Sequence, residues 1–317
     1  MKTAIRLENP NQRMNPIVKE IKRHWQLYLM ALPAVLLIFV FNYVPLTGLV
    51  MAFQDLDYSK GIFTSPWAGL QNFKFLFATT DAWVITRNTV GYNVVFIILT
   101  QVLSVALALV LNELASKNLQ KVLQTTYMMP FFLSMVVVGM IALAFLHYEY
   151  GYVNSIIKEQ GGKPIYWYNR TDVWVWLLVV IYLWKNVGYS SILYTAVISA
   201  IPQEFYEAAA LDGATRWQQI RHITIPHLRT IICINLIRAC GGIFRSDFGL
   251  FYTVPNNEGA LYPVTNVLDT YIYNSLMNSP NLGMSTAAGF YQSVVGFILV
   301  LTVNKIIKDM DSESAMF

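Results

Sequence analysis

Long runs of apolar residues without charge most constrain what this chain of 317 residues can fold into. Three stretches, 27–53, 88–112 and 122–146, contain no Asp, Glu, Lys or Arg. Each is longer than the roughly 20 residues that a helix needs to cross the hydrocarbon of a bilayer. Within lipid the backbone polar groups are satisfied only in helices or closed barrels, and long uninterrupted apolar runs favour helices. We therefore expect membrane-spanning helices.

Three further stretches complete the pattern. The segment 173–203 contains one charge, Lys185, and 270–304 contains none, whereas 230–253 contains Arg238, Arg245 and Asp247. The sequence thus predicts an all-α integral membrane protein with six transmembrane helices. Pro33 and Pro45 in the first span and Pro130 in the third are expected to bend or interrupt their helices, which neighbouring helices in a bundle can tolerate.

Composition agrees with a membrane protein. Only 13% of the residues are charged, against roughly 25% in soluble domains. A chain that is 56% hydrophobic and 14% aromatic also has too much apolar surface to stay disordered. We expect one membrane domain over 27–308, a tail over 1–26 with an amphipathic surface helix from Pro16 to Trp25, and a short tail over 309–317. The first apolar run is too long for the core of a signal peptide, so a retained helix is expected.

The basic residues near the helix ends predict the orientation. Six spans place both termini on one side, and the segments of that side carry thirteen Lys and Arg residues against six on the other. The richer side holds Lys2, Arg6, Arg13, Lys19, Lys22, Arg23, Lys117, Lys121, Arg216, Arg221, Arg229, Lys305 and Lys308. Basic loops stay in the cytoplasm, so both termini are expected to be cytoplasmic.

The loop 201–226, between the fourth and fifth spans, predicts two short helices on the cytoplasmic face. Pro202 suits a first helical position, Glu204 and Glu207 suit a helix N-terminus, and Gly213 can adopt the left-handed conformation that ends a helix. A second helix is expected over about 215–222, and Pro226 is expected to open the fifth span. The small residues Ala208, Ala209 and Ala210 would let a partner approach closely, with Phe205 and Tyr206 as apolar anchors. The alternative is that the loop only connects two spans.

The spacing within this loop resembles a known motif. Glu207-Ala208-Ala209 is followed after three residues by Gly213 and after nine more by Ile223-Thr224-Ile225-Pro226. This pattern resembles the EAA loop of ATP-binding-cassette (ABC) importer permeases, with Ile225 in place of the usual Leu. In that family the loop is the coupling helix that fits a cleft on the cytoplasmic ATPase. The resemblance therefore implies that Glu207, Ala208, Ala209, Asp212 and Gly213 are the coupling residues.

The resemblance covers almost the whole chain. The segments 88–90, 130–134 and 184–189 are similar to maltose-transporter-type sugar permeases, and 245–252, 267–271 and 292–297 look like the LplB-type polysaccharide permeases. It implies the type I ABC importer permease fold, and the import of an oligosaccharide, such as a complex or uronate-containing glycan, by alternating access in a bacterial cell membrane. It also implies four kinds of partner: a second, homologous permease, two ATPase subunits that bind ATP and Mg, an extracellular solute-binding protein, and the sugar.

Polar residues inside the spans are candidates for the substrate path. Ionisable groups within a membrane usually face the bundle interior or a water-filled cavity. Arg238 and Arg245 are expected on one face of the fifth helix, where they, with Asn235 and Asp247, could bind sugar hydroxyls or carboxylates. The alternative is that Arg245 pairs with Asp247 or with the partner permease and fixes the packing. Lys185 is expected to extend to the membrane interface.

Several aromatic residues have two interpretations. They could stack on sugar rings, or they could belong to the Trp and Tyr belts at the membrane interface. These residues are Tyr127, Trp167, Tyr168, Trp174 and Trp176.

The sequence contains no phosphate-binding loop, no pair of Cys or His residues at metal-ligand spacing, and no catalytic constellation. ATP is therefore expected to be bound by another polypeptide, and no catalysis, metal or cofactor is expected within this chain. Two alternatives to a permease remain at this point. A secondary carrier would use Arg238, Arg245 and Asp247 in ion coupling, and a membrane-embedded enzyme would need a catalytic constellation.

Overall fold

The computed structural model describes residues 20, 22–57, 59–74, 80–278 and 282–310. All the regular elements of this part of the chain are helical, and one isolated antiparallel bridge joins Gln54 to Trp67. The helices are α2 (Trp25–Ile38), η2 (Phe39–Tyr43), η3 (Val44–Phe53), η4 (Gln71–Phe73), α4 (Thr80–Asn112), α5 (Lys117–Met128), η5 (Met129–Phe132), α6 (Met135–Leu146), α7 (Tyr152–Glu159), η6 (Trp167–Asn169), α8 (Thr171–Ser199), α9 (Gln203–Leu211), α10 (Arg216–Gln219), η7 (Ile220–Thr224), α11 (Ile225–Gly241), η8 (Gly249–Thr253), η9 (Gly259–Leu261), α12 (Tyr262–Thr265), α13 (Leu268–Asn278) and α14 (Leu282–Met310).

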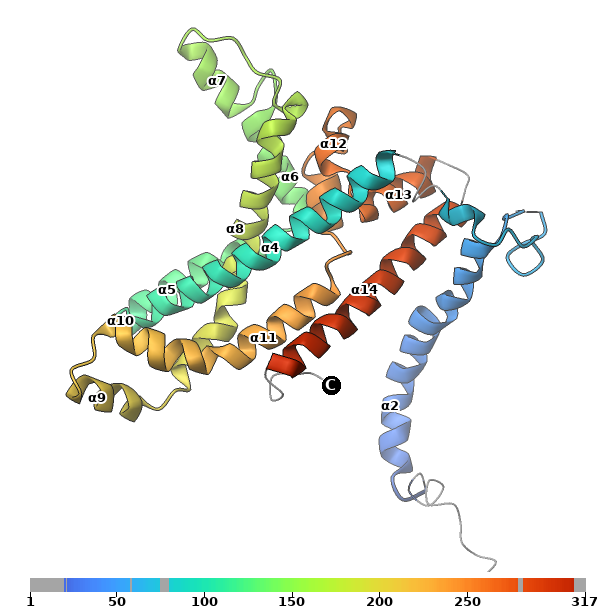
Figure 1. The fold of residues 1–317 in the computed structure, drawn as a ribbon. Helices are drawn as coiled ribbons and strands as arrows, with labels where there is room; N and C mark the ends of the chain where they lie inside the picture. The colour runs from blue at the N-terminus through green and yellow to red at the C-terminus, as the bar shows by residue number, and fades with distance from the viewer. Residues whose placement is uncertain (1–19, 21, 58, 75–79, 279–281, 311–317) are drawn as a thin grey trace, which may run out of the picture.

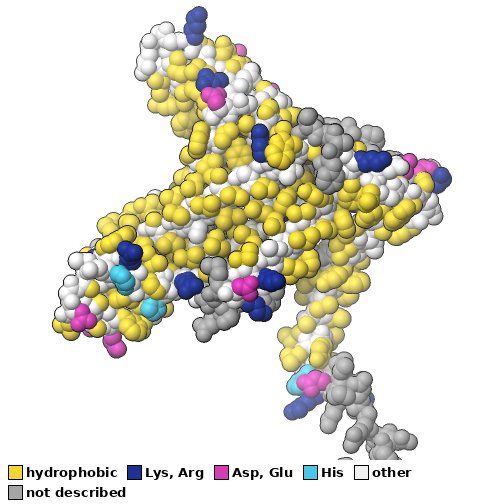
Figure 2. Space-filling model, viewed as in Figure 1, with side chains coloured by type: hydrophobic (Ala, Val, Ile, Leu, Met, Phe, Trp, Pro, Cys, Tyr) yellow, Lys and Arg dark blue, Asp and Glu magenta, His cyan; other side chains and the backbone are white. Residues whose placement is uncertain are grey.

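The six predicted spans are confirmed in number. Five helical segments of the described chain are long and apolar enough to cross a membrane, and a sixth span consists of two helices. The five are Trp25–Phe53, Ala82–Asn112, Thr171–Ser199, Arg216–Gly241 and Leu282–Ile306. Apolar side chains cover the middle of the molecule, whereas the charged side chains gather towards its extremities (Figure 2). The protein is therefore a multi-pass membrane protein.

The third span is broken, as Pro130 predicts. The segments Lys117–Phe132 and Met135–Leu146 meet at an angle of 93°. Pro130 lies in the 3-10 turn η5 that ends the first piece, where its missing N–H cannot continue the α-helical ladder. Ser134 begins α6, and its side-chain oxygen accepts a hydrogen bond from the Val137 amide. The first span, in contrast, runs on past Pro33 to Ile38 and changes to a π-turn and a 3-10 helix around Pro45.

The predicted bounds of the fifth and sixth spans are wrong. The fifth span begins at Arg216 instead of Thr230. The predicted short helix is present as α10, and α11 begins with Pro226 in its first turn as expected, but both belong to one continuous helical span. A π-turn, η7, lies directly before Pro226 and widens the helix where the proline ring would otherwise meet the preceding turn. The same span ends at Gly241, well before Thr253. The predicted sixth span is two helices, α13 and α14, of which only α14 is long enough to cross.

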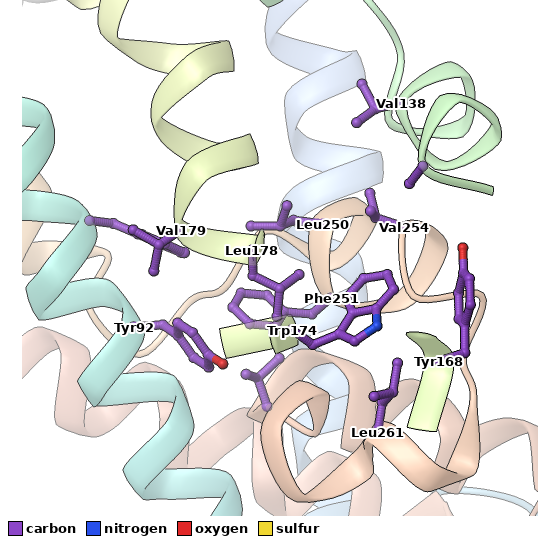
Figure 3. Close-up of a cluster of buried hydrophobic side chains, with 13 residues drawn as sticks. Tyr92, Val138, Tyr168, Trp174, Leu178, Val179, Leu250, Phe251, Val254 and Leu261 are labelled. Carbon is purple, nitrogen blue, oxygen red and sulfur yellow. The ribbon is translucent and has the colours of Figure 1, made fainter. Parts of the chain in front are cut away.

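The core lies where α4, α6, α8 and the segment 249–267 meet. Trp174 and Leu178 of α8 are buried against Phe251 of η8, together with Tyr92 of α4 (Figure 3). The indole Nε1 of Trp174 donates to the carbonyl oxygen of Trp167 at 3.0 Å, which satisfies its polar atom within the core. A second cluster joins α4, α8 and α11 nearer the end that carries α9. The core therefore ties α8 to both ends of the bundle.

Helix α2 lies apart from this core, and none of its residues is buried (Figure 1). The first span joins the rest of the protein through η3, which contacts α14. The loop after η3 is held by Asn72, whose side-chain nitrogen donates to the carbonyl oxygens of Ala52 and Gln54 at 3.1 and 2.8 Å. Residues 16–19 and 21 of the predicted amphipathic helix from Pro16 to Trp25, and residues 311–317 of the predicted tail, lie outside the described residues.

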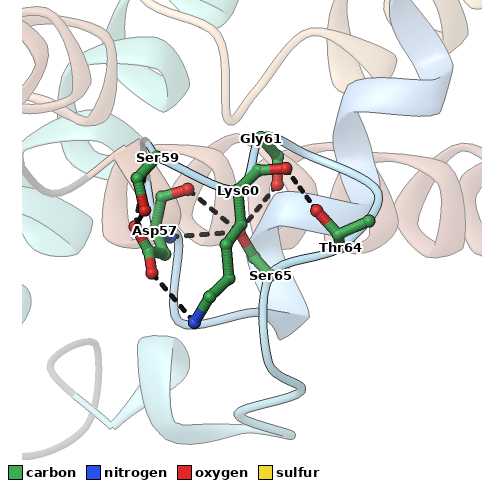
Figure 4. A network of polar contacts seen from close by, with 6 residues as sticks. All are labelled: Asp57, Ser59, Lys60, Gly61, Thr64 and Ser65. Atoms are coloured by element: carbon green, nitrogen blue, oxygen red, sulfur yellow. Dashed lines mark hydrogen bonds and ion pairs between the residues drawn. The ribbon is translucent and has the colours of Figure 1, made fainter.

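A turn in the same loop is organised by Asp57 (Figure 4). The Asp57 carboxylate accepts hydrogen bonds from the Ser59 amide and hydroxyl and pairs with the Lys60 ammonium at 3.1 Å. The hydrogen bonds from Ser59, and then the contact with Lys60, lower the pKa of Asp57 to about 2. The carboxylate therefore keeps its charge, and the turn its bonds, down to strongly acidic pH.

The packing of α8 on the third span gives a test of the fold. Gly188 is buried, and a Cβ atom placed on it would lie 1.9 Å from the carbonyl oxygen of Tyr127. Gly188→Ala should therefore lower the free energy of unfolding by about 1–3 kcal/mol, because backbone must move. The matched control is Gly91→Ala, since Gly91 is also helical but has no atom within 4 Å of the added carbon. Equal thermal unfolding midpoints for the two purified variants would contradict this packing.

Candidate functional site

The loop 201–226 folds as a short helix, a tight turn and the start of a long helix. Helix α9 ends in a Schellman motif, in which the Ala214 amide bonds to the Ala209 carbonyl and the Gly213 amide to the Ala210 carbonyl, at 2.9 and 3.1 Å. Gly213 has φ of +80°, the left-handed conformation that the sequence predicts. Thr215 then forms a capping box with Gln218 and begins α10.

This loop presents apolar and small side chains at one end of the molecule. Glu207, Ala208, Asp212 and Gly213 are exposed, and Ala209 is half-buried. A cavity of about 320 Å³ lies between α9 and α10 and is lined by Ala209, Asp212, Gly213, Ala214, Gln218, Gln219, His222 and Ile223. Two large apolar side chains of the same loop that the sequence pattern did not single out, Leu211 and Trp217, are 89% and 67% exposed. The sequence does contain a signal for them: a large apolar residue stands on each side of the predicted helix end, Leu211 before it and Trp217 after it.

The two predicted aromatic anchors differ from one another. Phe205 is exposed, with its ring near that of His227. Tyr206 is half-buried, and its hydroxyl forms a hydrogen bond of 2.9 Å with the Thr224 hydroxyl. The Gln219 side-chain nitrogen also donates to the Tyr206 carbonyl oxygen at 3.4 Å. Tyr206 thus joins α9 to the long helix.

The long helix of the fifth span, Arg216–Gly241, carries two of the four candidate residues for the substrate path, Asn235 and Arg238. The Asn235 side-chain nitrogen donates to the Tyr194 hydroxyl at 2.9 Å, and that hydroxyl donates to Gln101 at 2.9 Å, so Asn235 connects α11 to α8 and α4. Arg238 lies in the last turn of α11 and is exposed. A cation is favourable at a helix C-terminus, where the free carbonyl groups carry partial negative charge.

The other two candidates lie beyond the helix. The expectation that Arg238 and Arg245 share a face of the fifth helix is wrong, because the helix ends at Gly241 and Arg245 lies in the segment that follows. Arg245 is exposed, and it is not within ion-pair distance of Asp247, whose carboxylate accepts a hydrogen bond from the Leu250 amide at 3.1 Å. Asp247 therefore begins η8 instead of neutralising Arg245.

Lys185 forms a contact with the third span that its position in the sequence does not predict. The expectation that it extends to the membrane interface is wrong, because Lys185 is buried. Its ammonium donates hydrogen bonds to the backbone carbonyl oxygens of Phe131 at 2.8 Å, of Pro130 at 3.4 Å, and of Leu133. These carbonyl groups lie at the break in the third span, where helical bonding is incomplete. The Pro130 carbonyl also accepts from the Leu133 amide at 3.2 Å.

Several of the segments that carry the resemblance meet in a cluster of polar contacts. The Asn88 side chain donates to the carbonyl oxygens of Pro263 and Asn266, and the Thr89 hydroxyl accepts from the Leu268 amide at 2.9 Å. Asp269 accepts from the Ser246 amide at 2.6 Å and from Gln292 at 3.3 Å. The segments 88–90, 245–252, 267–271 and 292–297 are thus parts of one network that holds the chain between α11 and α14.

Comparison with known proteins agrees with this arrangement. Residues 101–311 match the model of the family described as "Binding-protein-dependent transport system inner membrane component". This chain is a member of that family. The match extends over more than half of the protein and includes the loop 201–226 and the contacts of Lys185, whereas Asn88 and Thr89 of the other polar cluster lie before its first residue.

Two relatives and one solved structure are similar over almost their whole length. The polygalacturonan/rhamnogalacturonan transport system permease protein YteP of Bacillus subtilis (strain 168) is 32% identical, over 95% of this chain and 93% of that protein. Protein LplB of the same organism is also 32% identical, over 92% of each chain. The crystal structure of a bacterial ABC transporter involved in the import of the acidic polysaccharide alginate matches with a TM-score of 0.84 and 31% identity, over 94% of this chain and 100% of that one.

These matches confirm the predicted fold and class: the protein is a transmembrane permease subunit with the type I ABC importer fold. The alternatives of a secondary carrier and of a membrane-embedded enzyme are set aside, since the family consists of membrane components of binding-protein-dependent transport systems. Within the described residues, no three His, Cys, Asp or Glu side chains lie close enough to hold a metal ion.

The role of Lys185 can be tested by an apolar replacement of similar length. Lys185→Met should lower the free energy of unfolding by about 1–3 kcal/mol, because carbonyl groups inside the membrane lose their donor. Lys121→Met, on an exposed position of α5, is the control and should change it by less than about 0.5 kcal/mol. Thermal unfolding of the detergent-purified variants measures both. If Lys185→Met and Lys121→Met have the same thermal unfolding midpoint, the Lys185 ammonium does not stabilise the break in the third span.

Proposed function

We propose that this chain is one of two homologous permeases of an ATP-driven importer that carries an acidic oligosaccharide across a bacterial cell membrane. An extracellular binding protein delivers the sugar, and two cytoplasmic ATPase subunits, which bind the ATP and Mg, drive alternating access. The observation that carries the proposal is the exposed α9 loop with the EAA spacing, projecting from one end of a bundle of the importer fold.

The loop 201–226 is the proposed ATPase contact. Its exposed apolar side chains lie beyond the end of the bundle, where they would be costly to leave in water and where lipid does not cover them. Ala208, Ala209 and Gly213 permit close approach of a partner, and Glu207 and Asp212 add charges that can pair with it. Phe205 extends the same surface, while Tyr206 fixes the orientation of α9 from behind.

The sidedness follows from the same loop. The start of α2, the end of α14 and α9 lie on one side of the molecule, and α7 and α12 lie on the other (Figure 1). The basic residues of 216–229 and 305–308 are on the α9 side. We therefore propose that this side, with both termini, faces the cytoplasm.

The substrate class is proposed from Arg238 and Arg245. Both are exposed in a part of the chain that would lie at membrane depth, where a guanidinium needs water, a partner chain or an anionic ligand. A guanidinium can bind a carboxylate through two parallel hydrogen bonds. The name of YteP refers to the transport of polygalacturonan and rhamnogalacturonan, and the solved transporter is involved in the import of alginate, which agrees with a uronate as the group that these arginines bind. Asn235 and Asp247 position the two segments that carry them.

The coupling role of α9 can be tested by copurification. Gly213→Trp should abolish recovery of the ATPase subunits from mildly solubilised membranes in which the neighbouring genes are coexpressed, because the residue must leave φ of +80° and its ring would occupy the docking surface. Gly161→Trp is the matched control: Gly161 has φ of +78° and an equally open environment, but lies on the α7 side. Mass spectrometry of the recovered complexes gives the result.

Equal recovery of the ATPase with both variants would contradict the coupling assignment. Recovery of a chain that transports without any ATPase, and only with an ion gradient, would contradict the importer itself.

The substrate class can be tested in reconstituted vesicles. Arg238→Gln and Arg245→Gln should each reduce ATP-dependent uptake of oligogalacturonate by roughly tenfold or more, since each removes a charged hydrogen bond worth about 1.5–3 kcal/mol. Arg170→Gln is the control, because Arg170 is exposed on the α7 side and pairs with Asp172 at 2.8 Å. Uptake that is unchanged in both path variants would assign the arginines to the contact with the second permease.

A further inference from the structure

A second cavity lies at the end of the molecule opposite α9. Its volume is about 520 Å³, within the range of roughly 300–1,000 Å³ that small-molecule sites occupy. Its walls come from the end of α6, the segment 147–150, the segment 166–168 and the turn at 256–258. No residue of the coupling loop and none of the four path residues lines it, whereas Trp167 and Tyr168, two of the aromatic residues that could stack on sugar rings, do. The proposed function gives this cavity no role.

Aromatic rings form most of the wall. Tyr148, Tyr150 and Tyr166 are 40%, 65% and 54% exposed, although polar loops on a protein surface rarely leave several rings uncovered together. The rings of Tyr148 and Tyr166 are 5.0 Å apart and tilted, and the ring of Tyr150 stacks on His147 at 3.5 Å. The negative faces of such rings attract the partly positive C–H groups on one face of a saturated ring.

The wall is held in place by one buried residue, Asn154 of α7. Its side-chain nitrogen donates to the carbonyl oxygens of His147, Tyr148 and Ile165, at 3.3, 3.2 and 2.9 Å. Its side-chain oxygen accepts from the Ile165 amide at 3.0 Å and from the Trp167 indole at 3.2 Å. Because Asn154 fixes both aromatic segments, the cavity exists before any ligand binds, which lowers the entropic cost of binding.

The polar groups of the cavity select the charge of its ligand. Among the described residues, Glu149 and Glu258 line it and no Lys or Arg does. Carboxylates accept hydrogen bonds from hydroxyl groups and repel other carboxylates. Tyr168 also lines it; this side chain is 8% exposed, and its hydroxyl has no hydrogen-bond partner among the described residues. Burial, with a further contribution from Tyr150, raises the pKa of Tyr168 to about 12, so the hydroxyl keeps its proton.

We propose that this cavity is an outer binding site for an uncharged sugar ring, in which the tyrosine rings pack against the sugar and Glu149 and Glu258 accept its hydroxyl protons. The assignment to the outer face rests on the proposed function, since it takes α9 as cytoplasmic. The site would hold a neutral unit of a mixed glycan at the entrance, while Arg238 and Arg245 bind the uronates further along. It therefore predicts that the transported glycan contains both neutral and acidic sugars.

Binding can be measured on the full chain with its copurified partners in lipid nanodiscs. Saturation-transfer NMR would be recorded with the methyl glycosides of glucose, galactose, mannose and rhamnose, and with that of galacturonate. We expect saturable binding of at least one neutral glycoside and weaker binding of the galacturonate. In the double variant Glu149→Gln, Glu258→Gln, binding of the neutral glycoside should fall by about tenfold, because charged hydrogen-bond acceptors are lost, and its preference over galacturonate should shrink.

Tyr166→Ala should also weaken binding of the neutral glycoside. Glu159→Gln and Tyr152→Ala are the matched controls, because both residues are exposed on α7 and lie outside the cavity lining. The proposal is overturned if no neutral glycoside binds, if galacturonate binds more tightly than every neutral glycoside, or if the cavity variants bind like the controls. Binding of methylguanidinium in place of the glycosides would also overturn it, by assigning the cavity to an arginine of the binding protein. Copurification of the ATPase is scored separately, so a failed sugar site remains distinguishable from a failed importer assignment.

Discussion

The break in the third span depends on one charged contact, and much of the bundle is arranged around it. A helix that turns by 93° leaves backbone carbonyl groups without helical partners, and lipid offers none. The Lys185 ammonium supplies the donors from α8. For the contact to form, α8 must lie against the break, and the missing side chain of Gly188 lets it approach the Tyr127 carbonyl. The second piece, α6, is then free to pack against η8 and to present its end to the outer loops.

The same principle explains the polar cluster between α11 and α14. This stretch of chain is irregular, so its amides and carbonyl groups need side-chain partners. Asn88 and Thr89 supply them from α4, Asp269 from α13 and Gln292 from α14. The motif residues of the resemblance are therefore those that satisfy backbone groups away from regular helices. They preserve the fold whatever sugar is carried, whereas the exposed Arg238 and Arg245 take no part in these bonds.

The sequence predicted the apolar spans, the break at Pro130 and the turn at Gly213, because each depends on local chemistry: apolar length, a missing N–H and a left-handed φ. It failed where tertiary context decides. Pro226 does begin α11, yet the π-turn η7 joins α11 to α10, so the long helix starts at Arg216. Lys185 resembled an interfacial lysine because its carbonyl partners lie 52 or more residues away in the chain. The cavity wall comes from three segments that are separate in the chain, two of them joined by Asn154, and it has no local pattern.

The long helix of the fifth span connects the two proposed sites. It runs without a break for 26 residues, from Arg216 beside α9 to Gly241 just beyond Arg238, or roughly 40 Å at 1.5 Å per residue. At one end the capping box and the bond between Tyr206 and Thr224 fix α9 to it, and at the other Asn235 bonds to Tyr194 of α8. If an ATPase displaces α9, the displacement therefore passes to the guanidinium of Arg238 through a rigid element. The helix boundary that the sequence misplaced is thus the feature that makes such coupling possible.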